Sequence, residues 1–372
     1  MAYHSIRPGQ VWLDTEGNRI QAHGGSIITV DGIFYWYGEN KEKTTGKDEI
    51  WHWGVRCYSS KDLYNWKSEG IIIPPDMEDK ASPLHPTAMM DRPHIIYNEK
   101  TKKYVAWLKI MGEPPCFAVL TADSVLGPYE MVGSKVNPCG LAVGDFDLQV
   151  DVLTKKAYLI SQKPHTCIYV AELNQEYTDA MGTYTEHFLH TAPPEAREAP
   201  AHFIRNGVHY LITSGTTGYY PNPSEAAKAS GWNGPYEILG NPHINDRSKT
   251  SFNSQITSVF RHPGRKDLYI ALADRWKPEI CRMEGYRSGK YSDRIQEKFR
   301  RIFSPKVEFV FTEEDAKDMK INSSISDYVW LPLKFDGDKV RIEWMDEWTI
   351  EEFDEALPLS EKTAFKKMPE KS

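Results

Sequence analysis

The chain has 372 residues and a net charge of −7, with 40% hydrophobic and 26% charged residues, as is ordinary for a folded globular protein. It carries no basic block beyond short pairs such as Lys366–Lys367, which excludes a nucleic-acid-binding surface. It also has no run of 18 apolar residues, which excludes a membrane-spanning helix.

The five cysteines form no CxxC pair, and their odd number argues against a complete disulfide framework. The opening residues, Met1–Pro8, contain no apolar signal-peptide core. We therefore expect a cytoplasmic protein, or a secreted one if a leader has been removed from this sequence.

Short apolar and aromatic runs dominate the chain, and they are typical of β-strands because they mix β-branched with aromatic residues beside Gly, Pro, Asn or Asp. In chain order these runs are Ser26–Val30, Ile33–Tyr37, Tyr104–Lys109, Phe117–Thr121, Ala157–Ser161, Val208–Thr213, Leu268–Ala273 and Tyr328–Phe335. Only two short helices are predicted, Glu225–Ala229 and Glu313–Met319.

A turn followed by a strand tyrosine recurs along the chain. The tyrosines are Tyr35, Tyr104, Tyr158, Tyr210 and Tyr269, with spacings of 69, 54, 52 and 59 residues. A second motif, Gly-Pro-Tyr-Glu, occurs at Gly127–Glu130 and again at Gly234–Glu237. Repeats of 50 to 60 residues with room for four strands each predict a propeller, and five tyrosine units predict five blades. A β-sandwich is the alternative, but it gives no reason for both motifs to recur in the same order.

We therefore expect an all-β protein, a five-bladed β-propeller forming one domain over residues 1–372. The stretch 1–20 leads into the first blade, and the charged tail from about 355 to 372 is expected to fray.

Acidic and amide side chains recur where the blades begin. Asp91, Asp145, Asp147, Glu198 and Gln255 each stand before or within the first strand of a predicted blade. Because first strands line the axis of a propeller, we expect these groups to converge at one mouth. Acids in one pocket raise each other's pKa, and glycosidic cleavage needs a protonated acid beside an ionised one.

Several segments together resemble glycoside hydrolase family 43. Arg197–Pro200 is similar to the motif that carries its catalytic acid, and Asp145–Asp147 is similar to the segment with its pKa-modulating Asp. Gln21–Gly25 and Tyr35–Lys41 resemble the first blade of its exo-β-1,3-galactanase branch. The resemblance extends over most of residues 8–350.

The resemblance implies roles for individual residues. Glu198 is the expected general acid, which protonates the departing glycosidic oxygen. Asp145 is preferred to Asp147 as the modulator that keeps Glu198 protonated. Gln255 matches a glutamine that handles the nucleophilic water in the galactanase branch. An amide is a poor base, so the identity of the base stays open between an imidic-acid form of Gln255 and a relay through a neighbour.

Two departures from the family pattern bear on function. Most of family 43 has a general-base Asp at the start of blade one, where this chain has His23–Gly25. The galactanase branch typically has Glu before Arg-Pro, where this chain has Asp91. The shorter reach of Asp91 is compatible with another terminal sugar, such as arabinofuranose.

The remaining candidates bind sugar or pack the fold. Asp91, Glu39, Asp147, His23 and Thr216 are expected to contact the sugar. An ion pair between Asp91 and Arg92, a blade-edge contact of Glu39 and a strand-capping role for Asp147 are the structural alternatives. Four tryptophans are candidates for stacking on sugar faces or for the core: Trp51, Trp53, Trp107 and Trp276.

We expect no metal ligand and no required cofactor, because the histidines match no ligand spacing. The axial channel leaves room for a structural cation. The expected partner is an oligosaccharide or polysaccharide, with no nucleic acid and no membrane. The expected activity is exo-acting, inverting release of galactose from β-1,3-galactan or arabinogalactan-type polysaccharide. The alternatives are an α-L-arabinofuranosidase, a β-xylosidase, or a carbohydrate-binding propeller without catalysis.

Overall fold

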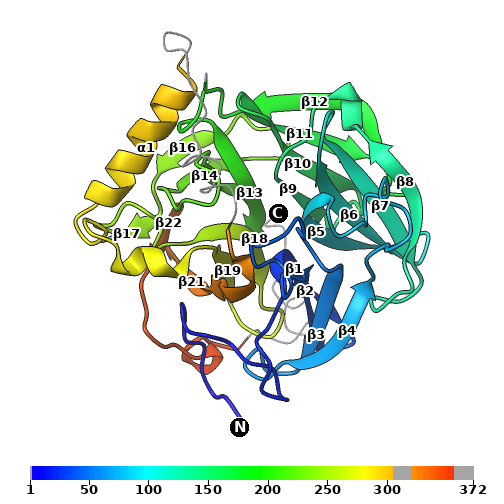
Figure 1. The fold of residues 1–372 in the computed structure, drawn as a ribbon, viewed down its shortest axis with the longest axis horizontal. Coiled ribbons are helices and arrows are strands. Elements are labelled where there is room, and N and C mark those ends of the chain that lie inside the picture. The colour runs from blue at the N-terminus through cyan, green and yellow to red at the C-terminus, as the bar shows by residue number, and fades with distance from the viewer. Residues whose placement is uncertain (1, 191, 305–320, 356–372) are drawn as a thin grey trace, which may run out of the picture.

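Five sheets surround a central axis in the computed structural model, which describes residues 2–190, 192–304 and 321–355 (Figure 1). Their strands are antiparallel, except for one short parallel pair in the fifth sheet. The predicted five-bladed β-propeller is therefore confirmed. Most of the predicted tail and the predicted helix over 313–319 lie outside the described residues.

The first four blades each contain four strands that follow one another in the sheet. Blade one consists of β1 (His23–Val30), β2 (Ile33–Glu39), β3 (Val55–Ser60) and β4 (Lys67–Ile73). Blade two consists of β5 (Met89–Asn98), β6 (Lys103–Met111), β7 (Cys116–Ala122) and β8 (Glu130–Val136). Blade three consists of β9 (Phe146–Val150), β10 (Ala157–Lys163), β11 (Cys167–Leu173) and β12 (Ala180–His187). Blade four consists of β13 (Arg197–Arg205), β14 (Val208–Gly215), β15 (Glu225–Ala229) and β16 (Glu237–Gly240).

Blade five is larger, because segments distant in sequence complete it. Its main strands are β18 (Gln255–Arg261), β19 (Tyr269–Arg275), β21 (Leu331–Asp336) and β22 (Lys339–Glu343), with the short β17 (His243–Ile244) beside β22 and β20 (Asp327–Tyr328) beside β19. The described helices are α1 (Lys290–Ile302) and the 3-10 turns Pro138–Gly140, Pro278–Arg282, Ser323–Ile325 and Ile350–Glu352.

The repeated turn-and-tyrosine motif is the hairpin that joins the first two strands of every blade. Its five tyrosines lie on β2, β6, β10, β14 and β19. Each hairpin also contains a non-glycine residue with φ between 50° and 60°; these residues are Asp31, Lys102, Lys155, Asn206 and Asp267. The left-handed region favours Asn and Asp among such residues, so the motif marks a turn conformation as well as a strand.

The hydrophobic core is divided among the junctions between blades. The innermost strands β1, β5, β9, β13 and β18 contact one another in a closed ring, and one apolar cluster fills each of the five junctions. The junction of blades one and five is the most aromatic, with Trp36, Trp66, Trp330 and Trp348 almost fully buried. It also holds the lead-in, because Ile6 pairs with Trp348 and Trp12 packs edge-on against Trp330.

Two helix expectations differ from the structure. Glu225–Ala229 was predicted to be a helix and is instead β15, because it pairs with β14 and β16 inside blade four. The longer helix α1 was not predicted, and it buries Tyr291 and Ile295 against Ile280 at the side of the propeller. No helix among the described residues is long and apolar enough to cross a membrane.

Candidate active site

Three of the acids predicted at the starts of the blades, Asp91, Asp145 and Glu198, meet at one mouth of the axis. Irregular pairing positions them, since the register shifts after His23 in β1, after Asp91 in β5, after Glu198 in β13 and after Ile256 in β18. The residues that follow three of these groups have positive φ: Gly24 at 64°, Arg92 at 50° and Ala199 at 49°. Bulges of this kind redirect a side chain out of the strand pattern and are common beside active sites.

Six side chains from four blades form a continuous sequence of contacts, which we name the polar chain; they are Asp91, Lys109, Asp145, Arg92, Gln255 and Glu198. Lys109 Nζ lies 3.1 Å from Asp91 Oδ2 and 2.7 Å from Asp145 Oδ1. Arg92 Nε lies 2.9 Å from Asp145 Oδ2, and Arg92 Nη2 donates to Gln255 Oε1. Gln255 Nε2 donates to Glu198 Oε1 at 3.1 Å. Carboxylates and cations therefore alternate from the sugar-binding candidate Asp91 to Arg92, and the amide of Gln255 connects Arg92 to the candidate acid Glu198.

Burial and charge give Glu198 and Asp145 opposite protonation states at neutral pH. Burial raises the pKa of Glu198 to about 8, and the charge of Asp145 acts in the same direction against Arg92 and Lys109. Burial would also raise the pKa of Asp145, but the two cations outweigh it and lower that pKa to about 2. A neutral carboxylic acid thus lies beside an ionised carboxylate, which is the pairing that acid-catalysed glycoside cleavage requires.

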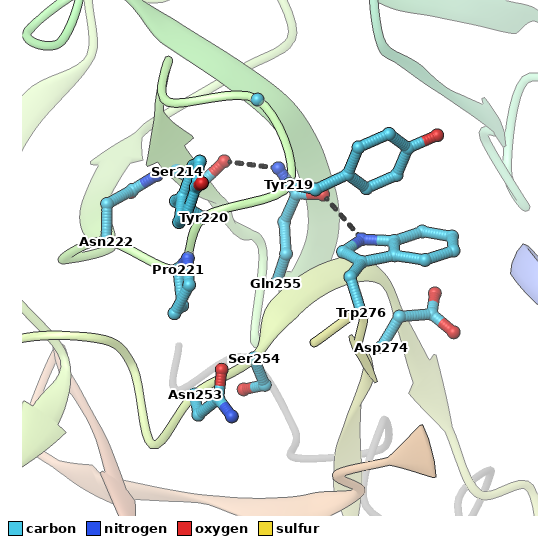
Figure 2. Close-up of a pocket in the computed structure, with 11 residues that line it drawn as sticks. Ser214, Tyr219, Tyr220, Pro221, Asn222, Asn253, Ser254, Gln255, Asp274 and Trp276 are labelled. Atoms are coloured by element: carbon cyan, nitrogen blue, oxygen red, sulfur yellow. Dashed lines mark hydrogen bonds between the residues drawn. The ribbon is translucent and has the colours of Figure 1, made fainter. Parts of the chain in front are cut away.

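Gln255 holds its amide in one orientation (Figure 2). Its Oε1 accepts from Arg92 Nη2 and from Trp276 Nε1, two groups that can only donate. Its Nε2 therefore faces the acceptors Glu198 Oε1 and, at 2.9 Å, Ser214 Oγ. All four hydrogen-bonding positions of the Gln255 amide are used inside the protein. In the imidic-acid form Oε1 would carry a proton, but both groups that face Oε1, on Arg92 and Trp276, are donors and could not accept it. This geometry favours positioning of Glu198 over the predicted handling of water.

Asp91 and Glu39 form the opposite wall of the site with Lys41. Asp91 Oδ1 accepts from Trp51 Nε1 at 2.7 Å, and its side chain is 14% exposed. Lys41 Nζ lies 2.7 Å from Glu39 Oε2 and 3.8 Å from Asp91 Oδ1. Burial raises the pKa of Glu39 to about 7, although Lys41 opposes the shift. The ion pair between Asp91 and Arg92 that the sequence offered as an alternative does not form; Asp91 pairs with Lys109 and Arg92 with Asp145.

Glu39 occupies the space that a side chain on residue 24 would need. A Cβ on Gly24 would lie 2.3 Å from Glu39 Oε1. Residue 24 lies in the segment where most of family 43 is expected to carry its base, and here only glycine fits. Blade one thus lacks the Asp of the family pattern, and the Glu39 carboxylate from β2 lies in this region instead.

Replacing Gly24 with Ala is expected to destabilise the protein and displace Glu39. Gly32 is the matched control, because its φ of 78° is also left-handed while nothing lies within 4 Å of an added Cβ. Gly32→Ala should cost about 1–2 kcal/mol of unfolding free energy from backbone strain, and Gly24→Ala should cost about 1–3 kcal/mol more from overpacking. Urea denaturation of both variants measures the difference, and equal losses would contradict the close contact with Glu39.

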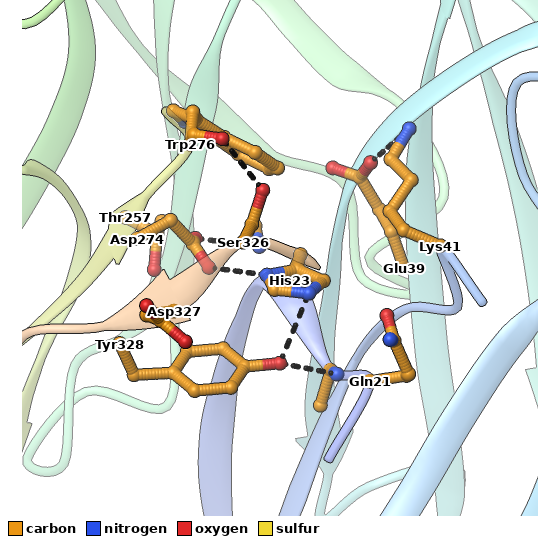
Figure 3. Close-up of polar contacts among 12 residues, drawn as sticks. Gln21, His23, Glu39, Lys41, Thr257, Asp274, Trp276, Ser326, Asp327 and Tyr328 are labelled. Carbon is orange, nitrogen blue, oxygen red and sulfur yellow. Dashed lines mark hydrogen bonds and ion pairs between the residues drawn. The ribbon is translucent and has the colours of Figure 1, made fainter. Parts of the chain in front are cut away.

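His23 lies behind the site rather than in it (Figure 3). Its ring is fully buried, with Nδ1 2.8 Å from Asp274 Oδ1 and Nε2 3.2 Å from the Tyr328 hydroxyl. Asp274 Oδ2 also accepts from Gly24 N at 2.8 Å. His23 therefore anchors the first strand of blade one to blade five, and the contact with sugar predicted for it has no open ring nitrogen to use.

Asp147 and Thr216 are also held by the protein. Asp147 is 1% exposed, its Oδ2 accepts from His202 N at 2.7 Å, and burial raises its pKa to about 7. Thr216 is buried, and its hydroxyl donates to Ala196 O at 2.8 Å. Asp145 is thus the member of the Asp145–Asp147 pair that takes part in the polar chain, while Asp147 Oδ1 lies 3.5 Å from His94 Nε2.

A pocket opens beside the polar chain. Its lining includes Ser214, Tyr219, Asn222, Gln255, Asp274 and Trp276. Glu198 does not line it, but Gln255 connects Glu198 to it.

Three aromatic rings stand at this mouth. Tyr219 lies 6.1 Å from Trp51 and 5.4 Å from Trp276 between ring centroids. Of the other predicted stacking candidates, Trp107 is fully buried in the junction of blades two and three, and Trp53 lies beneath Lys43 Nζ at 3.3 Å. Only Trp51 and Trp276 of the four tryptophans therefore border the site.

Sequence reasoning missed several residues of the site, namely Lys41, Arg92, Lys109, Tyr219 and Asp274. Arg92 was considered only as a partner of Asp91, and Lys109 ends a run that looks like any strand. Tyr219 comes three residues after Thr216, in the same glycine-containing loop. An aromatic residue in such a loop was the signal that could have identified it. Asp274 gave a signal too, because it is an acid at the end of the otherwise apolar run Leu268–Ala273.

Among residues 2–190, 192–304 and 321–355, no group of three or more His, Cys, Asp or Glu converges as a metal site. The predictions that the chemistry needs no cofactor and that the channel has room for a structural cation stay predictions.

A five-bladed propeller whose mouth holds a protonated carboxylic acid beside an ionised one has the architecture of a glycoside hydrolase. The family model described as glycosyl hydrolases family 43 matches residues 19–284, and the chain belongs to this family. The resemblance drawn from the sequence is therefore confirmed. No curated protein matches the chain.

Several solved structures are similar to the chain, and those named here are described as β-1,3-galactosidases or as an exo-β-1,3-galactanase. A family 43 β-1,3-galactosidase with galactodeoxynojirimycin is 30% identical, with a TM-score of 0.74 over 93% of this chain and 100% of that one. A second β-1,3-galactosidase is 27% identical, with a TM-score of 0.74; the match covers 94% of this chain but only 64% of that longer one. An exo-β-1,3-galactanase variant from Phanerochaete chrysosporium with β-1,3-galactotriose is 25% identical, with a TM-score of 0.71 over 93% and 68%.

Proposed function

We propose that this protein is an exo-acting glycoside hydrolase that releases terminal galactose from β-1,3-galactan or arabinogalactan-type polysaccharide. The observation that carries the proposal is the neutral Glu198 beside the ionised Asp145. The named activities of the similar solved structures support galactose as the sugar.

Glu198 acts as the general acid. Its Oε1 accepts from Gln255, so the acidic proton resides on Oε2. As the glycosidic bond breaks, its electron pair stays on the leaving oxygen, and the proton moves from Oε2 to that oxygen. The anomeric carbon takes its new bond from water. The proton that this water loses passes to solvent, from which Glu198 regains its own proton. General acid catalysis of this kind contributes about 10²–10⁴-fold to a rate.

Asp145 supports the acid without reacting itself. Arg92 and Lys109 each hold one of its oxygens, so it is poorly placed to attack carbon as a nucleophile. Its charge keeps the proton on Glu198 until the leaving oxygen develops negative charge. This arrangement favours direct attack by water, and hence inversion at the anomeric carbon, over a covalent intermediate.

The opposite wall binds the sugar. The side chain of Asp91 is more exposed than those of Glu39 and Asp145, and an ionised carboxylate accepts strong hydrogen bonds from hydroxyl groups. Glu39 holds Lys41 and the Arg92 backbone in place behind it. The similarity to an exo-β-1,3-galactanase supports exo action on one terminal residue.

Product analysis tests the proposal. Purified protein is incubated with β-1,3-galactan and, separately, with 4-nitrophenyl β-D-galactoside, α-L-arabinofuranoside and β-D-xyloside. We expect galactose as the sole early product from galactan, appearing as the α-anomer in rapid proton NMR spectra. Preferential cleavage of the arabinofuranoside or xyloside would contradict galactose as the released sugar and would indicate that the shorter Asp91 selects arabinofuranose or xylose. Binding of galactan without release of any sugar would contradict hydrolysis and would favour a carbohydrate-binding propeller without catalysis.

A further inference from the structure

Lys109 occupies an unusual position for a lysine, at the centre of the polar chain. It lies on β6 directly opposite Asp91 on β5, and its side chain is only 9% exposed. Its ammonium contacts Asp91 in blade two and Asp145 ahead of the first strand of blade three. No other lysine among the described residues bridges two carboxylates of the candidate site at distances of 3.1 Å or less.

A buried lysine persists only where carboxylates compensate for the loss of hydration. The charged and titratable groups around Lys109 are Asp91 and Arg92 from β5, Asp145 ahead of β9, Glu198 on β13, and Glu39, Lys41 and Tyr219 beyond Asp91. Burial opposes its charge, but Asp145 and Asp91 raise its pKa above the ordinary value. Lys109 is therefore a fixed cation throughout the range in which Glu198 titrates.

We propose that Lys109 is a positioning residue whose ammonium ties Asp91 on the sugar-binding wall to Asp145 on the acid wall and fixes both carboxylates. The inference rests on the proposed function and deepens it. Without Lys109, the carboxylates of Asp91 and Asp145 would have no cation between them, and Arg92 alone would hold Asp145. The sugar-binding wall is then no longer in register with the acid.

The sign of the pH effect follows from the neighbours. Lys109 lowers the pKa of Asp145 and also that of Glu198. Removing its charge therefore raises both pKa values. If activity needs Asp145 ionised and Glu198 protonated, both limbs of the pH profile move to higher pH. A merely structural role would reduce the rate and leave both limbs in place.

Three substitutions separate these outcomes. Lys109→Met and Lys109→Gln remove the charge, with the polar Gln variant available if Met impairs folding, and Lys109→Arg keeps the charge. The matched control is Lys103→Met on the same strand, because Lys103 is 40% exposed and pairs only with the exposed Asp123. Carboxyl carbon-13 NMR titration, with Asp145 assigned by Asp145→Asn, reports on the positioning without requiring activity.

We expect the titration midpoint of Asp145 to rise by about 1 pH unit or more in the neutral variants, and kcat/KM on the substrate that wild type cleaves to fall about 10²-fold with both limbs shifted upward. Lys109→Arg should restore the midpoint, and Lys103→Met should match wild type. An unchanged midpoint in both neutral variants would overturn the inference. A shifted midpoint in a protein that cleaves no glycoside would retain the link between Lys109 and Asp145 while the proposed function fails.

Discussion

Glu198→Gln is expected to lower kcat/KM on the natural substrate by about 10²–10⁴-fold, because the variant has no proton to give to the leaving oxygen. Substrate binding should persist, since glutamine keeps the shape of the side chain and an acceptor for Gln255. Initial rates of galactose release and calorimetric titration with a β-1,3-galactan oligosaccharide measure the two effects separately. Glu195→Gln is the matched control, because Glu195 is about half exposed and pairs with Arg300 at the surface.

The same variant has a signature in stability. The folded pKa of Glu198 is about 8 against an ordinary value of 4.5, so the folded state binds the proton more tightly than the unfolded chain does. Wild type should therefore lose stability relative to Glu198→Gln as pH rises from 4.5 to 8. Denaturation midpoints at pH 5 and pH 8 test this, and wild-type activity in Glu198→Gln would refute the assignment of the acid.

Asp145→Asn is expected to damage both stability and catalysis. It removes the counter-charge of two buried cations, Arg92 and Lys109, and breaking a buried ion pair costs about 3–5 kcal/mol. Without the charge of Asp145, the pKa of Glu198 falls, so the alkaline limb of kcat/KM should move to lower pH. Denaturation curves and pH–rate profiles measure these outcomes.

The pH dependence of that stability loss has a definite sign. The folded pKa of Asp145 is about 2 and its ordinary value is 3.8, so its contribution is complete above about pH 4 and disappears as pH falls toward 2. The difference between wild type and Asp145→Asn should narrow over this window. Asp123→Asn, which alters an exposed pair with Lys103, should change stability by less than about 1 kcal/mol. A stable Asp145→Asn variant with an unmoved alkaline limb would contradict the role of Asp145.

The blades could be predicted because each one repeats the same short sequence motif. A hairpin with a left-handed turn residue followed by a strand tyrosine is a local signal, and it occurs in every blade. Local signals also misled, since Glu225–Ala229 has helix-forming residues but lies between two strands that require its backbone hydrogen bonds. The helix α1 was detectable, because Tyr291, Ile295 and Phe299 recur every four residues on its buried side.

A site residue could be predicted where its type and position in the sequence indicate its chemistry. It could not be predicted where its role depends on the residues that it contacts in the folded protein. Glu198 and Asp145 are acids at the starts of innermost strands, so their shared position was visible in the sequence. The partners of Asp145 could not be predicted, because Arg92 and Lys109 reach it from a neighbouring blade through a bulge and a buried lysine stem. His23 and Thr216 sit in suggestive segments, but their side chains are used by Asp274 and by Ala196 O. Such assignments depend on distances between blades, which a linear pattern does not contain.

The pKa of Glu198 is the quantity on which the proposed chemistry depends most directly. It can be measured by carboxyl carbon-13 NMR titration of the wild-type protein, with the Glu198 signal assigned by its absence in Glu198→Gln. The arrangement of Glu198, Asp145 and Gln255 predicts a midpoint at about 8. A midpoint near the ordinary value of 4.5 would show that Glu198 is ionised at neutral pH, and the protein would then lack its proposed acid.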